Sequence, residues 1–172
     1  DFVIEISYLG PTSSSDNGRP MGYSGGFSNR FFIRESSALL LFQDSTGSGI
    51  NTVPPTAYNS DRAARAYGVF RFTRTSGTVV AEYNNVTFAT QSITGSFEFD
   101  QFFRHAGSIA GLGSGIEYIS FVVAGSLVAY YDPSATSGTG TTLEDTTGTN
   151  DGTLTDFTGT INSWWVSYST GT

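Results

Sequence analysis

The chain has 172 residues with fifteen acidic side chains, eight basic side chains and one histidine, which gives a formal charge of −7 at pH 7. This charge repels phosphate backbones, so nucleic acid is not expected as a partner. All eight basic residues are arginine, and neither lysine nor cysteine occurs, which excludes disulfides, thiolate metal sites and Schiff-base chemistry. The length fits one domain, residues 1–172.

The apolar segments are too short to span a membrane. A membrane helix needs roughly 20 apolar residues, and the nearest stretch, residues 116–131, contains Glu117, Gly125 and Ser126. The sequence opens directly on a strand pattern at Asp1, which is typical of a mature exported chain after removal of a signal. We therefore expect an extracellular or cell-surface protein without a membrane span.

The first predicted strand has an alternating apolar face made of Phe2, Ile4, Ile6 and Tyr8. A turn-rich stretch near residues 10–26 follows and separates this strand from the next one. The strand is therefore a candidate donor strand that pairs with the sheet of a neighbouring molecule. Pairing within its own domain is the favoured alternative.

The next segments read as strands at residues 27–34 and 38–43, followed by a long loop near residues 44–61 that is rich in glycine and proline. Residues 61–66 form the one predicted helix, about one turn long, with Asp61 as its N-cap.

A β-hairpin is predicted where residues 67–74 and 78–89 flank the short turn Thr75-Ser76-Gly77. Residues 93–100 alternate as a further strand, and a glycine-rich loop near residues 101–115 follows.

The last third of the chain begins with residues 116–131, which are too many for one ordinary strand. They form either a bent strand that crosses between sheets or two strands that meet at a bulge. A polar loop near residues 132–152 precedes two closing strands at residues 153–158 and 160–169. About nine short strands without a long helical pattern predict an all-β fold, an antiparallel β-sandwich or jelly roll.

Four aromatic doublets are the main functional indication of the sequence. Neighbouring strand residues face opposite sides, so one ring of each doublet points away from the core and must meet solvent, a ligand or another subunit. The doublets are Phe31–Phe32, Phe102–Phe103, Tyr130–Tyr131 and Trp164–Trp165. The candidate contact residues are Trp164, Trp165, Tyr168, Tyr130, Tyr131, Phe31 and Phe32.

These rings fit two kinds of contact. Trp164, Trp165 and Tyr168 are typical of a platform that stacks on sugar rings, and they equally fit a subunit seam. Phe31 and Phe32, between two arginines, are more typical of packing between layers or chains.

Catalytic patterns are weak. Gly22-Tyr23-Ser24-Gly25-Gly26 matches a nucleophile elbow, but no helix is predicted after it. His105 is the only histidine, with Asp100 upstream. The carboxylate pairs Glu98 with Asp100 and Glu82 with Glu117 are candidates for glycosidase chemistry. Solvated carboxylates on a strand are the favoured interpretation, so no catalytic residue is assigned.

One metal site and one modification site are candidates. Asp145, Asn150, Asp151 and Asp156 place oxygen ligands in a polar segment, a donor set suited to calcium, although a solvated acidic loop is favoured. No other cofactor is expected. Asn85 begins the N-glycosylation sequence Asn-Val-Thr.

Residues 92–100, Ser-Ile-Thr-Gly-Ser-Phe-Glu-Phe-Asp, resemble the "TGSF-x-(F/Y)-D" strand of secreted bacterial β-sandwich proteins of the PEP-CTERM-sorted type. The resemblance covers under ten residues and implies export to the cell surface or matrix. It brings no catalytic residues.

The expected function is therefore that of an extracellular structural or adhesive protein, a homo-oligomer or polymer that builds a cell-surface or matrix filament. A carbohydrate-binding module with a polysaccharide partner is the first alternative, and a small β-sandwich hydrolase is the second.

Overall fold

The structure, a computed structural model, describes residues 1–11, 17–23, 28–99, 101–102, 104–105, 108–109, 115–132, 142–148 and 150–153. These residues form mostly β-strands in two larger antiparallel sheets, so the all-β prediction is confirmed. Among them, no helix has the length and apolar character needed to cross a membrane.

The larger sheet has six strands in the order β13-β12-β1-β6-β7-β8, and every neighbouring pair is antiparallel. Its strands are β1 (Phe2–Leu9), β6 (Gly68–Thr75), β7 (Thr78–Tyr83), β8 (Val86–Ser92), β12 (Gly115–Val123) and β13 (Ser126–Tyr131).

The second sheet has five strands in the order β5-β4-β3-β2-β9. They are β2 (Asn17–Gly22), β3 (Arg30–Arg34), β4 (Leu39–Gln43), β5 (Gly49–Thr52) and β9 (Gln101–Phe102). Two short pairs join β10 (Arg104–His105) to β11 (Ser108–Ile109) and β14 (Thr142–Leu143) to β15 (Gly152–Thr153). The helices are η1 (Glu35–Ser37) and α1 (Thr56–Ala64).

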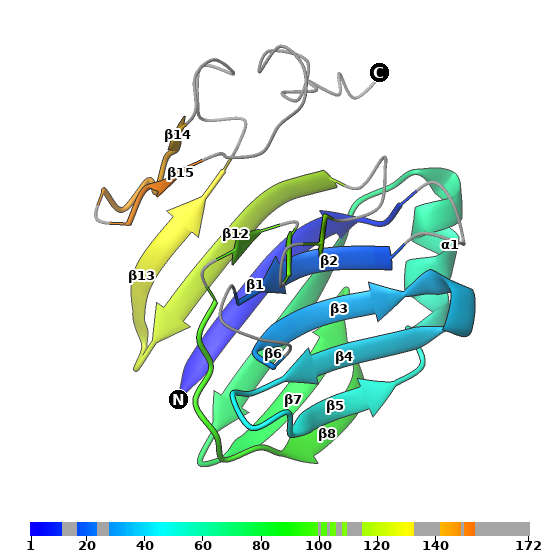
Figure 1. The fold of residues 1–172 in the computed structure, drawn as a ribbon, viewed down its shortest axis with the longest axis horizontal. Coiled ribbons are helices and arrows are strands. Elements are labelled where there is room, and N and C mark those ends of the chain that lie inside the picture. The colour runs from blue at the N-terminus through cyan, green and yellow to red at the C-terminus, as the bar shows by residue number, and fades with distance from the viewer. Residues whose placement is uncertain are drawn as a thin grey trace.

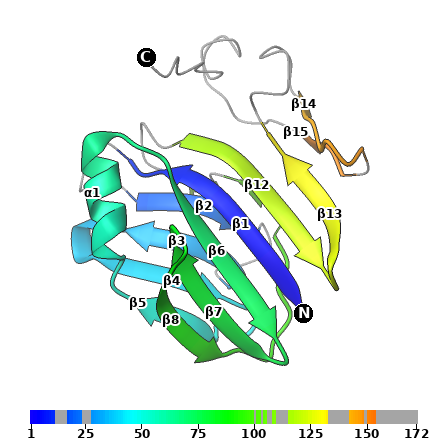
Figure 2. The same ribbon diagram turned by 180° about the vertical axis from the view of Figure 1, so that it is seen from behind.

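The core lies between the two sheets, which face each other in Figures 1 and 2. Phe31 of β3 meets Phe70 and Phe72 of β6 edge to face, with ring centroids 5.0 and 4.9 Å apart. Phe42 of β4 stacks on Phe72 at 3.9 Å. Burying a phenylalanine stabilises the fold by about 1.5–3 kcal/mol, so these ring contacts between layers hold the two sheets together.

β1 lies in the centre of the six-stranded sheet. It pairs with β12 on one side and with β6 on the other, both from its own chain. Ile4, Ile6 and Tyr8 are buried, and Phe2 packs at the margin of the core. The structure therefore shows the intramolecular alternative for this strand and not the donor pairing with another molecule.

Tight turns divide two segments that were predicted as longer strands. Residues 78–89 contain β7, the turn Asn84–Asn85 and the start of β8. A third predicted strand, residues 93–100, is not regular over residues 93–99. Residues 116–131 form the β12–β13 hairpin around Ala124–Gly125, which is neither of the two expected forms. Both turns have positive φ at each central residue, as in type I′ hairpins. The β6–β7 hairpin across Ser76-Gly77 is observed as predicted.

The predicted long loops also contain regular structure. Residues 44–61 include β5 and the first part of α1, residues 10–26 include β2, and short strands lie within residues 101–115 and 132–152. The helix begins at Thr56, with Pro55 and not Asp61 at its N-cap.

Asp61 instead accepts hydrogen bonds from the Tyr83 hydroxyl at 2.7 Å and from the Asn84 amide at 3.1 Å. The helix also buries Tyr58 against the core. The aspartate and the tyrosine therefore tie α1 to the sheets.

Candidate functional site

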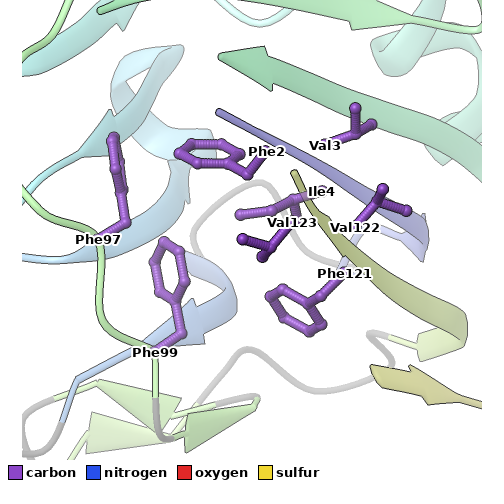
Figure 3. A pocket seen from close by; sticks show the side chains of 8 residues that line it. All are labelled: Phe2, Val3, Ile4, Phe97, Phe99, Phe121, Val122 and Val123. Atoms are coloured by element: carbon purple, nitrogen blue, oxygen red, sulfur yellow. The ribbon is translucent and has the colours of Figure 1, made fainter. Parts of the chain in front are cut away.

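An apolar cavity of about 160 Å³ opens beside the end of the β12–β13 hairpin. Figure 3 shows its side chains, which come from β1, from the end of β12 and from the segment after β8. They are Phe2, Val3, Ile4, Phe97, Phe99, Phe121, Val122 and Val123. No charged side chain belongs to this set, so the cavity favours an apolar group.

Aromatic contacts fix one wall of the cavity. Phe97 meets Phe2 edge to face at 5.2 Å and stacks on the core ring of Phe42 at 4.8 Å. The guanidinium of Arg74 lies 6.0 Å from the centre of the Phe2 ring and 5.8 Å from that of Phe97. Arg74 also donates to the Gly95 carbonyl at 2.9 Å. The wall is therefore held in place by the core and by a cation over the rings.

Exposed aliphatic side chains continue from the cavity along the hairpin. Val123 is 47% exposed, Leu127 52% and Val128 39%. We call these three residues the hairpin-end patch. Isolated exposed apolar residues are ordinary, but a group of them beside an apolar cavity is typical of an interaction surface.

The face of the six-stranded sheet that points away from the second sheet carries a different surface, the tyrosine face, made of Tyr118, Tyr130, Glu5 and Arg71. The rings of Tyr118 and Tyr130 stack across β12 and β13 with centroids 5.8 Å apart and planes 15° from parallel. Glu5 on β1 forms an ion pair with Arg71 on β6. Burial, and next the charge of Glu5, raises the pKa of Tyr118 above its ordinary value. Aromatic rings beside hydrogen-bonding groups on a flat sheet can stack on a sugar.

The predicted aromatic contacts of β3 are enclosed. Phe31 lies in the core, and Phe32, on the other face of the strand, is only 4% exposed. The guanidinium groups of Arg30 and Arg34 each lie 5.6 Å from the centre of the Phe32 ring. The second ring of this doublet is thus covered within its own chain.

The two rings of the Tyr130–Tyr131 doublet lie on opposite faces of the strand, as strand geometry requires. Tyr131 is buried and donates to the Asn150 carbonyl at 2.6 Å, whereas Tyr130 is half-buried on the tyrosine face. Trp164, Trp165 and Tyr168 lie outside the described residues, as does Phe103, and the side chain of Phe102 is not described.

The proposed calcium ligand Asp145 is buried and surrounded by hydrogen-bond donors. One carboxylate oxygen accepts the backbone N–H groups of Tyr130 at 2.8 Å and Thr147 at 3.0 Å. The other accepts the Thr147 hydroxyl at 2.5 Å and the Asn150 N–H at 3.1 Å. Asp151 accepts the Asp145 N–H at 2.9 Å, and Asp156 lies outside the described residues. This arrangement is a hydrogen-bonded turn, and within the described ranges no group of three or more acidic or histidine side chains is placed to hold a metal.

The catalytic candidates do not converge in the described part of the chain. Ser24 and Asp100 lie outside it, and only the backbone of His105 is described. Glu98 is exposed. The backbones of Glu82 on β7 and Glu117 on β12 lie three strand spacings, about 14 Å, apart across the sheet. The Glu117 carboxylate accepts the Ser7 hydroxyl of the neighbouring strand β1 at 2.7 Å.

Asn85 is exposed in the turn before β8, where a glycan has room. Comparison of the chain with family models, with curated proteins and with solved structures found no match.

Proposed function

We propose that this protein is an extracellular structural or adhesive subunit, with a β-sandwich body, that assembles with copies of itself into a cell-surface or matrix filament. The observation that carries the proposal is the hairpin-end patch beside the apolar cavity. Covering each of its half-exposed aliphatic side chains stabilises a complex by about 1 kcal/mol. A copy that inserts an apolar side chain into the cavity would bury both surfaces at once.

The test is the concentration dependence of the assembled mass. Analytical ultracentrifugation of the wild type should show species larger than the monomer, and Leu127→Ser should shift them towards the monomer. Ala64→Ser, an apolar-to-polar change on the exposed end of α1, is the matched control. Equal association of the wild type and Leu127→Ser would contradict the proposal.

Carbohydrate binding is the second candidate function, favoured by the stacked pair Tyr118–Tyr130 with the Glu5–Arg71 ion pair beside it. A binding module of this kind would migrate more slowly in gels that contain a neutral polysaccharide. Replacement of Tyr130 by alanine should abolish the retardation, and Leu127→Ser should leave it unchanged. The candidates Trp164, Trp165 and Tyr168 are tested in the same gel by their own alanine variants.

A further inference from the structure

The two edge strands of the six-stranded sheet, β13 and β8, differ in whether their outer N–H and C=O groups have hydrogen-bond partners. At the β13 end, Asp145, Thr146 and Asn150 cover the strand. Tyr130 donates its N–H to Asp145 and accepts the Thr146 N–H at 2.8 Å. The Val128 carbonyl accepts the Asn150 amide at 3.0 Å. Such a cover prevents further strands from joining, so β13 is a protected edge.

At the other end, β8 has no such cover. Among the described residues its only strand partner is β7, and no hydrogen bond there joins its outer side to another segment. The seven residues Val-Thr-Phe-Ala-Thr-Gln-Ser contain no charge and no proline, and most of their side chains are exposed. Natural edges are usually protected by charges, proline or a bulge that twists the strand away. β8 carries neither a charged residue nor a proline. It has one bulge, where Phe88 is the extra residue opposite Ala81 and Glu82, and residues 89–92 beyond the bulge keep a regular register with β7.

The edge of the second sheet lies beside β8. β5 contacts β8 and is likewise uncharged, and both strands border the same flank of the molecule in Figures 1 and 2. Val86, at the start of β8, is 69% exposed, and Val53, just after β5, is 63% exposed. These are the two most exposed large apolar side chains of the described residues. Each of the two sheets therefore contributes an edge strand and an exposed valine to this flank.

We propose that β8 pairs antiparallel with β8 of a second copy, so that two six-stranded sheets become one continuous sheet across a twofold axis. A twofold axis always places a strand antiparallel to its own copy, and the two strands then match in length and pleat. A second copy also fits electrostatically. The chain carries a charge of −7, but β5 and β8 contribute none of it, so two copies that meet here bring no strand charges together. The pairing does not depend on the hairpin-end patch and holds for either proposed function.

The first test uses the absence of cysteine, which allows one thiol to be placed at a time. Single-cysteine variants at residues 87 to 91 are oxidised gently and separated under denaturing conditions. Covalent dimer should be most abundant at one position near the strand centre and decline on both sides. Ser60→Cys, on the exposed face of α1, is the control. Covalent dimer no more abundant on β8 than at residue 60 would overturn the pairing.

The second test places a charge on the edge. Thr90→Lys should weaken the dimer at least tenfold, because it adds two like charges to a strand pair that otherwise carries none, and Thr90→Ser should not. Both variants are measured by ultracentrifugation in the Leu127→Ser background, which removes the other proposed contact, with circular dichroism to verify folding. A dimer that Thr90→Lys leaves intact, or a Leu127→Ser protein that is monomeric at every concentration, would overturn the pairing. The second result would still leave the proposed function standing.

Discussion

Asp44 and Asp145 occupy equivalent positions in two hairpins that lie far apart in the chain. Each is buried, each accepts the N–H and the hydroxyl of the threonine two residues on, and each offers its carbonyl to the N–H of the glycine that follows. The two glycines, Gly47 and Gly148, have φ angles of 81° and 80°. The sequence Asp-(Ser/Thr)-Thr-Gly thus builds one turn twice, once between β4 and β5 and once between β14 and β15.

The first prediction concerns the stability that the Asp44 turn provides. This carboxylate also accepts the Gly95 N–H at 2.9 Å, which ties the segment after β8 to the second sheet. Asp44→Asn turns an amide NH₂ towards N–H groups, so we expect a loss of about 3 kcal/mol in the free energy of unfolding. Urea denaturation measures it, with Glu98→Gln as the exposed control. A loss below about 1 kcal/mol would show that the turn forms without the charge.

The second prediction concerns calcium. Because both oxygens of Asp145 already accept hydrogen bonds from its own turn, a cation would have to displace several donors. We expect millimolar calcium or a chelator to leave the melting temperature unchanged, and Asp145→Asn to lower it by several degrees in either buffer. A rise in melting temperature with calcium that disappears in Asp145→Asn would instead restore the metal site.

Much of the fold follows from the sequence, because strand alternation and glycine turns act locally. Phe2, Ile4 and Ile6 show the buried face of β1, and Ser76-Gly77 places one hairpin. The turn Ala124–Gly125 was missed because alanine rarely has a positive φ and so gives no turn signal. The turn Asn84–Asn85 was missed although asparagine favours positive φ, because the β-branched and apolar residues on both sides of it favour one continuous strand. Helix α1 was misplaced because it buries only Tyr58 and so shows little apolar periodicity.

The candidate site was harder to predict from the sequence than the fold. In the sequence, Val123, Leu127 and Val128 resemble core residues of a strand, but in the structure they lie exposed near the end of the β12–β13 hairpin. Conversely, Phe32 looks exposed by strand alternation but is covered by two arginines on its own strand. The paired Asp-Thr-Gly turns were visible as a repeated pentapeptide and could have been found by comparing residues 44–48 with residues 145–149.

The third prediction separates a structural role of the Phe31–Phe32 doublet from a role in binding. Phe31→Ala removes a ring from the contact between sheets and should cost about 3–5 kcal/mol of unfolding free energy. Phe32→Ala also removes the surface on which two guanidinium groups rest, and should cost about 2 kcal/mol. Guanidinium chloride unfolding measures both. A Phe32→Ala variant that keeps wild-type stability but loses self-association would show that this ring is a subunit contact.

The fourth prediction concerns alkaline pH. Burial raises the pKa of Tyr58 far above its ordinary value near 10. Nearby Tyr8 raises it further, as does Glu35, whose carboxylate accepts a hydrogen bond from the Tyr58 hydroxyl with the two oxygens 2.5 Å apart. The folded state therefore keeps the neutral phenol. The stabilisation that Tyr58 provides is complete at pH values below the pKa that this tyrosine has in the unfolded chain. Above about pH 10 the unfolded chain releases this proton while the folded protein retains it. Stability should then fall by about 1.4 kcal/mol per pH unit for each such tyrosine.

Tyr58→Phe isolates this contribution, because phenylalanine keeps the ring and has no proton to lose. The variant should be less stable than the wild type at pH 8, since it loses the hydrogen bond to Glu35, yet its stability should decline less steeply between pH 10 and pH 11. Urea unfolding at fixed pH values measures both effects. Tyr23→Phe, at a partly exposed tyrosine, is the control. Parallel pH profiles for the wild type and Tyr58→Phe would mean that Tyr58 ionises as readily in the folded protein as in the unfolded chain.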